Sequence, residues 1–163
     1  MARFLIVEAD GGSRGNPGPA GFGALVRDGK SGELLREIAE TIGVASNNVA
    51  EYSGLIAGLS AAHEIDPSAE ITVRMDSKLV IEQMSGRWQI KHPDMRELAL
   101  KARNIHDRAL ITYEWIPRAE NSHADSLANK ALDGISVAEI APKKQINFLT
   151  ERLTGTEKAT TIY

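Results

Sequence analysis

Hydrophobic residues gather in five short runs along the chain, and each run has the length of a β-strand. These runs, dense in Leu, Ile, Val and Phe or alternating with polar positions, cover 3–9, 21–28, 34–42, 70–75 and 110–116. The first run is apolar at nearly every position, which is typical of a strand buried on both faces. The run at 34–42 fits a helix or a strand, and the turn sequence at 30–32 favours a strand.

The remaining patterned segments have the spacing of helices. Apolar residues at 49, 52, 55, 56, 59 and 62 predict a helix over 48–63, with Asn47 or Asn48 as its N-cap. Helices are also expected at 77–84, at 93–108 and from Asn121 to near Gly134. The order βββαβααβα predicts an α/β fold with a mixed five-stranded sheet flanked by helices on both faces.

The pattern fades after residue 134. Residues 135–163 contain Pro, Lys, Thr and scattered apolar residues with no sustained period. We therefore expect one domain over 1–134, followed by a linker or C-terminal tail over 135–163. The chain has 163 residues, which is enough for one domain with a core of its own.

The amino-acid composition says more about the cellular location of the protein than about its function. The chain has no cysteine, which excludes disulfides and thiolate metal sites and is compatible with a cytoplasmic location, the one we expect. The apolar run near the N-terminus is too short for a signal peptide or a membrane span. The net charge of −3 means that any binding of nucleic acid must come from a local patch.

The stretch DGGSRGNPGPAGFG, residues 10–23, follows the first hydrophobic run. It lacks the G-x-x-x-x-G-K-[ST] spacing of a phosphate-binding loop, and Pro17 and Pro19 prevent a helix from starting there. The stretch therefore predicts strand, loop and strand, with Asp10 in or near the middle of a sheet. Taken alone, this would be a glycine-rich hairpin with a solvated Asp at its edge.

Three further carboxylates occupy comparable positions. Asp10 and Asp76 each follow a predicted strand, and if the two strands are parallel neighbours these acids share one edge of the sheet. Glu51 and Asp125 each fall in the predicted first turn of a helix, where the helix dipole alone would explain an acid. If all four acids meet, they repel one another unless cations such as Mg²⁺, which prefers oxygen ligands, neutralise them.

The segments that carry these acids resemble a known family. Asp10 in DGGSRGNPGPAGFG, Glu51 in NNVAEYSGLIAGL, Asp76 in MDSKLVIEQM and Asp125 in NSHADSLANKA are similar, in order, to the four signature segments of ribonuclease H type I. The resemblance covers residues 3–133. The chain lacks the basic insertion of well-studied bacterial members and is similar to the short-loop branch.

This resemblance implies endonucleolytic hydrolysis of the RNA strand of an RNA–DNA hybrid, leaving 5′-phosphate and 3′-hydroxyl ends. It implies two Mg²⁺ ions, with Mn²⁺ as a substitute. Asp10 would bridge both ions, Asp125 would hold the ion that activates water, and Glu51 and Asp76 would hold the ion at the leaving oxygen.

The expected contacts with the hybrid come from several places. The opening glycines would let the main chain approach the RNA ribose-phosphate, and an Asn-rich set and a basic, Trp-containing set would contact the two backbones. These residues are Gly11, Gly12, Gly15, Asn16, Asn47, Asn48, Lys78, Arg87, Trp88 and Lys91. Turn and cap roles for the Asn residues, a core role for the Trp and a solvated basic face are the plainer alternatives.

Two residues near Asp125 are candidates for a further catalytic role. Many type I enzymes carry a His in the loop before the last acid, but here that position falls at Trp115. Arg118 could assist phosphate or product release, and His123 could carry a proton, although a surface role is the plainer interpretation of His123. The other histidines lack paired spacing, so zinc is not expected.

Other functions share some of these features. Another nuclease of the same fold, such as a junction resolvase or an exonuclease, and a non-catalytic nucleic-acid-binding module remain alternatives. No membrane partner is expected. The chain is also similar to the N-terminal part of actinobacterial proteins that join a ribonuclease H to a histidine phosphatase domain, which would make such a domain a partner absent from this sequence.

Overall fold

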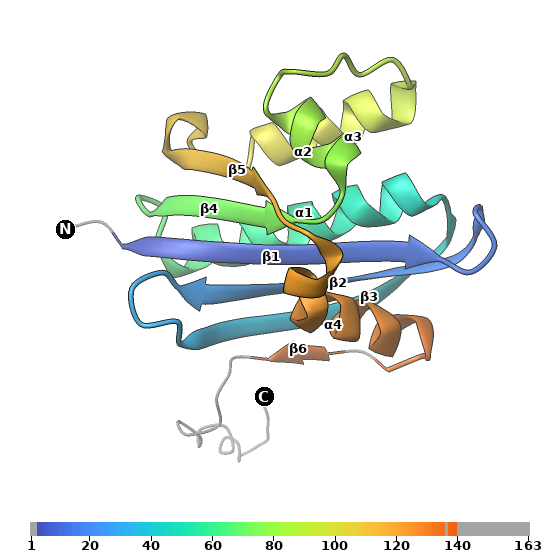
Figure 1. Cartoon of the computed structure of the whole chain (residues 1–163), viewed down its shortest axis with the longest axis horizontal. Coiled ribbons are helices and arrows are strands. Elements are labelled where there is room, and N and C mark those ends of the chain that lie inside the picture. The colour runs from blue at the N-terminus through green and yellow to red at the C-terminus, as the bar shows by residue number, and fades with distance from the viewer. Residues whose placement is uncertain (1–2, 136, 140–163) are drawn as a thin grey trace.

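The computed structural model describes residues 3–135 and 137–139, which form a twisted sheet with helices on both faces (Figure 1). The strands are β1 (Phe4–Ser13), β2 (Gly18–Asp28), β3 (Leu34–Ala45), β4 (Glu70–Met75), β5 (Ile111–Trp115) and β6 (Val137–Glu139). Their order across the sheet is β5-β4-β1-β2-β3-β6. β1, β2, β3 and β6 pair antiparallel, whereas β4 and β5 continue the sheet parallel to β1. The predicted mixed five-stranded sheet is confirmed, with one short strand added.

The helices are α1 (Asn47–Ile65), α2 (Lys78–Met84), α3 (Pro93–Arg103) and α4 (Ser122–Leu132), and short 3₁₀ turns span Arg108–Leu110 and Arg118–Asn121. α1 packs on one face of β1 and β2, and α3 packs on α1. α4 crosses the opposite face over β1, β2 and β3 (Figure 1). None of the described helices is long and apolar enough to cross a lipid bilayer.

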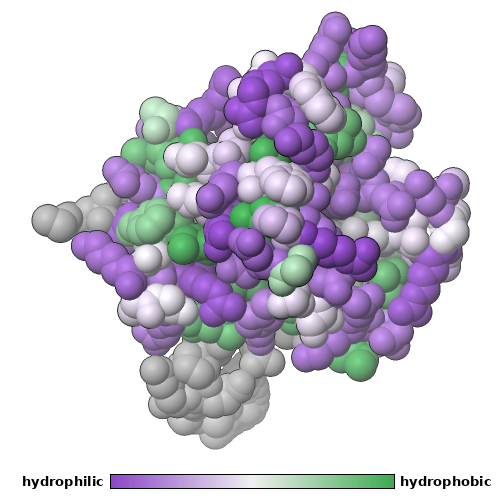
Figure 2. Space-filling view, in the orientation of Figure 1, coloured by the Kyte–Doolittle hydropathy of each residue, from purple (hydrophilic) through white to green (hydrophobic). Residues whose placement is uncertain are grey.

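The sheet buries one main core and one smaller core. Leu5, Val7, Leu55, Leu59 and Ile71 are among the buried side chains between the sheet and α1. A second cluster under α4 contains Leu25, Ala39, Ala124, Leu127 and Ala131. Polar residues cover most of the outer surface on the α4 side, with apolar groups in small scattered patches (Figure 2).

Several boundaries differ from the sequence-based predictions. β1 and β2 extend through the glycine-rich stretch because their antiparallel pairing continues to Ser13 opposite Ala20. α1 is capped by Ser46, whose Oγ accepts a hydrogen bond of 3.2 Å from the Val49 amide, so the prediction of an Asn cap is wrong. The third helix ends at Arg103, five residues earlier than predicted, and a separate 3₁₀ turn follows.

β6 lies in the segment that we expected to be a linker or tail. Its residues 137–139 pair antiparallel with β3 from Glu37 to Ala39. Three residues are too few to show a periodic pattern, so the sequence does not distinguish this strand from a loop. The rest of the segment, 140–163, lies outside the described residues.

A close approach between β1 and α1 requires a glycine at position 11. A Cβ added there would lie 2.3 Å from the Ala50 carbonyl carbon and oxygen and 2.6 Å from the Glu51 nitrogen. We expect Gly11→Ala to lower the free energy of unfolding by about 1–3 kcal/mol, because α1 must move away from β1. Urea unfolding checks this result.

Gly12→Ala is the matched control in the same strand. A Cβ at Gly12 would meet only the Asn47 Oδ1 atom, at 3.8 Å. We therefore expect a much smaller loss of stability for this variant. Equal losses in the two variants would show that the contact between β1 and α1 does not determine the effect.

Candidate active site

Two of the four acids lie side by side because of the sheet register. β1 and β4 are parallel neighbours, and their pairing runs from Phe4 opposite Glu70 to Glu8 opposite Arg74. Asp10 and Asp76 each lie two residues beyond this last pair, Glu8 and Arg74. We predicted that Asp10 ends its strand, and this is wrong. β1 continues past Asp10 in the hairpin with β2.

The other two acids come from helices on opposite faces of the sheet. Asp125 lies in the first turn of α4, as predicted. Glu51 lies in the second turn of α1, because that helix begins at Asn47. The helix dipole acts within the first turn, so it does not explain an acid at position 51. Glu51 instead accepts a hydrogen bond from the Ser77 hydroxyl and lies within reach of the charge of Asp76.

The four carboxylates influence one another through their charges. Burial, the charge of Asp76 and a hydrogen bond with Asp125 together raise the pKa of Asp10 to about 8, and burial is the largest of these causes. Burial also raises the pKa of Glu51 to about 7. The Ser77 hydroxyl, 2.9 Å from Glu51 Oε1, partly offsets this rise, while the Asp76 charge adds to it.

A buried asparagine that sequence reasoning missed holds two of these strands together. Asn121 is fully buried, and its Nδ2 donates to the Ala9 carbonyl at 2.9 Å and to Asp76 Oδ1 at 3.0 Å. Its Oδ1 has no hydrogen-bond partner within the described part of the chain. The sequence predicts only that Asn121 begins the last helix, and in the structure its side chain makes no capping bond.

Comparison with known proteins identifies the family of this chain. The family model described as "Reverse transcriptase-like" matches residues 8–131. The solved N-terminal RNase H domain of Rv2228c from Mycobacterium tuberculosis, determined as a fusion with maltose-binding protein, is 53% identical with a TM-score of 0.78, covering 82% of this chain and 96% of that one. The chain belongs to the ribonuclease H family.

Two further comparisons define the extent of the relationship. The Bifunctional protein Rv2228c of Mycobacterium tuberculosis is 52% identical over 138 residues, which are 84% of this chain and 38% of that protein. The chain thus spans well under half the length of this relative. The structure of LC11-RNase H1 in complex with an RNA/DNA hybrid is 38% identical with a TM-score of 0.75, covering 80% of this chain and 97% of that one.

The donor chemistry of the ribonuclease H site fits hard divalent cations. The four acids supply only oxygen ligands, which Mg²⁺ and Mn²⁺ prefer. Within residues 3–135 and 137–139, no three His, Cys, Asp or Glu side chains already stand close enough together to form a complete ligand set. The raised pKa values of Asp10 and Glu51 show how costly the charged cluster is by itself, and a cation among the acids would offset that cost.

This cost predicts how the stability of the metal-free protein depends on pH. The folded-state pKa values of Asp10 and Glu51 lie above their ordinary values of 3.8 and 4.5. Folding therefore favours the neutral acids, and this contribution is complete below the unfolded pKa values and is lost as pH rises through about 7 and 8. We expect the free energy of unfolding in chelator to fall between about pH 5 and pH 8, by roughly 1.4 kcal/mol per pH unit for each group until its folded-state pKa is reached, and the melting temperature to fall with it.

Thermal melts across this pH range, with and without Mg²⁺, test the expectation. Added Mg²⁺ should reduce the fall, because a bound cation stabilises the charged acids. The Asp10→Asn variant should show a flatter profile in chelator. A melting temperature that rises steadily with pH in chelator would contradict the proposed cause.

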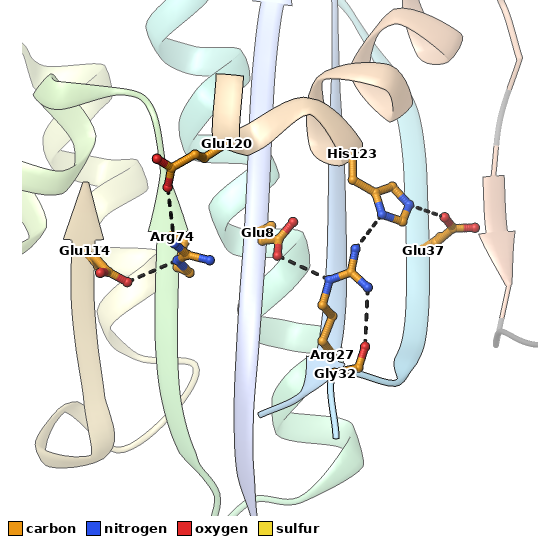
Figure 3. A network of polar contacts seen from close by, with 8 residues as sticks. All are labelled: Glu8, Arg27, Gly32, Glu37, Arg74, Glu114, Glu120 and His123. Atoms are coloured by element: carbon orange, nitrogen blue, oxygen red, sulfur yellow. Dashed lines mark hydrogen bonds and ion pairs between the residues drawn. The ribbon is translucent and has the colours of Figure 1, made fainter. Parts of the chain in front are cut away.

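The structure separates the two further catalytic candidates. Arg118 Nη2 lies 3.7 Å from Asp125 Oδ1, but the arginine side chain is 80% exposed, so the pair is weak. His123 turns toward the sheet, where Nδ1 lies 2.7 Å from Arg27 Nη2 and Nε2 lies 2.5 Å from Glu37 Oε2 (Figure 3). Both ring nitrogens of His123 thus have partners within the protein, which gives this residue a structural explanation.

Two of the Asn residues that we predicted to contact the hybrid, Asn16 and Asn47, form hydrogen bonds within the protein. Asn16 Oδ1 accepts a hydrogen bond of 3.0 Å from the Asn47 amide, and Asn47 Oδ1 accepts one of 2.8 Å from the Ser13 amide. The loop is therefore fastened to the start of α1. Gly15 has a φ of 93°, which a glycine adopts without strain. Asn48 lines an open groove of about 520 Å³ between the starts of α1 and α3.

Lys78 and Arg87, two of the basic residues that we predicted to contact the hybrid, have different partners in the structure. Lys78 Nζ stands 5.1 Å from the centre of the Trp115 ring, and the indole Nε1 of Trp115 donates to the Asp76 carbonyl at 3.2 Å. Lys78 is thus held close to the acids by a Trp that we did not predict as a site residue. Arg87 instead makes a two-point ion pair with Glu82, at 2.6 and 3.0 Å.

The other two members of the basic set are on the surface. Trp88 is 46% exposed and Lys91 is exposed, in the loop between α2 and α3. An exposed Trp does not fit the alternative of a core residue. Both side chains are accessible to a ligand.

Proposed function

We propose that this chain hydrolyses the RNA strand of RNA–DNA hybrids with the help of two divalent cations, Mg²⁺ or Mn²⁺. The observation that carries the proposal is the meeting of Asp10, Glu51, Asp76 and Asp125, from β1, α1, the end of β4 and α4, in one cluster that favours added positive charge. Membership of the ribonuclease H family supports the same reaction.

Each residue has a part that follows from its position. The charges of both Asp76 and Asp125 act on Asp10, so Asp10 would share two cations. Glu51 and Asp76 would hold one ion, and Asp125 the other. Cations bound there would supply an activated water and would neutralise charge at the leaving oxygen. The products would carry 5′-phosphate and 3′-hydroxyl ends.

The protein itself orients these ligands. Asn121 fixes Asp76, and Ser77, which caps α2 through Val80, also holds Glu51. A carboxylate held by such hydrogen bonds loses fewer rotamers when it binds a cation, and this favours binding.

We propose that the small main-chain surface around Gly12, together with Asn16 and Asn48, contacts the shallow minor groove of the hybrid, where RNA displays its 2′-hydroxyls. A hybrid is the ligand in the solved complex of LC11-RNase H1. A histidine phosphatase domain as a partner stays a proposal, supported by the name "bifunctional" of the mycobacterial relative.

A panel of nucleic acids tests the function. RNA–DNA hybrid, duplex RNA, duplex DNA and single strands of one sequence are incubated with the protein in Mg²⁺ and in chelator. We expect cleavage of the RNA strand of the hybrid alone, and none in chelator. Equal cleavage of duplex DNA, or cleavage that persists in chelator, would contradict the proposal.

A further inference from the structure

A second open groove lies beside β5, away from the acids. It has a volume of about 720 Å³ and lies between the ends of α2 and α3, the 3₁₀ turn at Arg108–Leu110 and the first half of β5. β5 forms an edge of the sheet, with β4 between it and β1. The last groove residue on β5, Tyr113, precedes the level of Asp76 by three residues, or roughly 10 Å along the strand. The groove is therefore a separate site.

Three arginines line this groove, each from a different element of the fold. Arg87 follows α2, Arg103 ends α3 and Arg108 begins the 3₁₀ turn. Glu82 neutralises Arg87. Within the described ranges of the chain, neither Arg103 nor Arg108 forms an ion pair with a carboxylate. The groove therefore carries a net positive charge although the protein as a whole is negative.

The half-buried Arg103 is positioned rather than free. Its Nη2 donates to the Gln83 carbonyl at 3.0 Å, which uses one of the five N–H groups of the guanidinium. A guanidinium that is fixed on one side presents its remaining donors in a constant direction and loses little entropy when it binds an anion. Such a fork matches the oxygens of a phosphate.

The rest of the lining suits the sugar or base attached to a phosphate. Ser85 and Thr112 bring hydroxyl groups, and Tyr113 brings an aromatic ring. Burial raises the pKa of Tyr113 to about 12, although Arg103 beside it acts in the opposite direction. The Tyr113 hydroxyl thus stays neutral at physiological pH and can donate a hydrogen bond.

We propose that the groove between α2, α3 and β5 binds a phosphate-bearing nucleotide unit through Arg103 and Arg108. The unit comes either from a nucleic-acid strand or from a free nucleotide, since both present the same phosphate and ribose. This site does not depend on the hydrolytic function of the four acids.

Binding of a fluorescein-labelled single-stranded DNA of about twelve nucleotides, followed by anisotropy in chelator, tests the site in the full chain. Chelator keeps cation-dependent binding at the acids out of the measurement. We expect Arg108→Gln to weaken binding about five- to tenfold and to lower the slope of log affinity against log salt by about one. Arg108 is exposed, so the substitution leaves the fold intact, and a thermal melt checks this.

Lys101→Gln is the matched control, because it removes one positive charge from an exposed position of α3 that does not line the groove. Its effect on affinity should be less than twofold. ADP added to the complex distinguishes the two sources of the nucleotide unit. If ADP displaces the labelled DNA and this displacement requires Arg108, a free nucleotide also occupies the site. If only unlabelled DNA displaces the labelled DNA, the site binds a nucleic-acid strand. Equal effects of Arg108→Gln and Lys101→Gln, or no DNA binding at low salt, would overturn the proposal.

Discussion

Asp10→Asn is expected to lower the rate of hybrid cleavage by a factor on the order of a thousand or more. The charges of two of the other three acids, Asp76 and Asp125, act on Asp10, so its loss removes the carboxylate that we propose to serve both cations. The amide has nearly the same shape and keeps the strand pairing of β1 with β2. Hybrid binding should persist or tighten, because the variant removes a negative charge close to the phosphates. Initial rates and anisotropy with the same hybrid measure the two quantities separately.

Asp133→Asn serves as the control for this change. Asp133 lies at the end of α4, its side chain is 57% exposed, and it pairs with Arg14 on the surface. The same chemical substitution there should leave the rate within about twofold, since exposed ion pairs contribute little. Cleavage by Asp10→Asn at close to the wild-type rate would rule out the proposed role of Asp10.

Asn121→Asp is expected to have the second largest effect, with a fall in cleavage of about a hundredfold and a loss of about 2–4 kcal/mol in the free energy of unfolding of the metal-free protein at neutral pH. The substitution replaces the amide that donates to Ala9 and Asp76 with a carboxyl group. A buried carboxylate there would repel Asp76 and leave the Ala9 carbonyl without its donor. Steady-state cleavage rates and urea unfolding in chelator measure the two losses.

Asn104→Asp provides the comparison. Asn104 is exposed beyond the end of α3, so the same change of side chain should cost less than about 1 kcal/mol and leave cleavage unaffected. If the two variants behave alike, Asn121 does not position Asp76 in the way that the hydrogen bonds indicate. A normal rate for Asn121→Asp would lead to the same conclusion.

Most strands of the sheet could be predicted from the sequence, because each strand has a local pattern of hydrophobic residues. The strand at 70–75 has the predicted bounds, and the parallel pairing of β1 with β4 brings Asp10 and Asp76 together as expected. The prediction that Asp10 ends the first strand was wrong, because the glycine-rich stretch continues the pairing of β1 with β2. Glycine has little strand preference by itself, and only its pairing partner shows that the strand continues.

Other features depend on contacts between distant segments and leave no periodic signal. Asn121 reaches β1 and the end of β4, more than forty residues away in either case, so nothing near it in sequence reveals its role. Trp115 forms its contacts with Lys78 and Asp76 across the sheet in the same way. His123 was a candidate because of its distance from Asp125 in sequence, whereas its direction follows from the packing of α4 on β2 and β3 (Figure 3).

The central claim is that divalent cations bind among Asp10, Glu51, Asp76 and Asp125. Paramagnetic broadening of backbone amide signals by substoichiometric Mn²⁺ tests it directly, because the effect is strongest close to the ion. We expect the amides next to these four residues to broaden first, and excess Mg²⁺ to restore them. Broadening that begins elsewhere in the fold, or that leaves any one of the four unaffected while the others vanish, would contradict the claim.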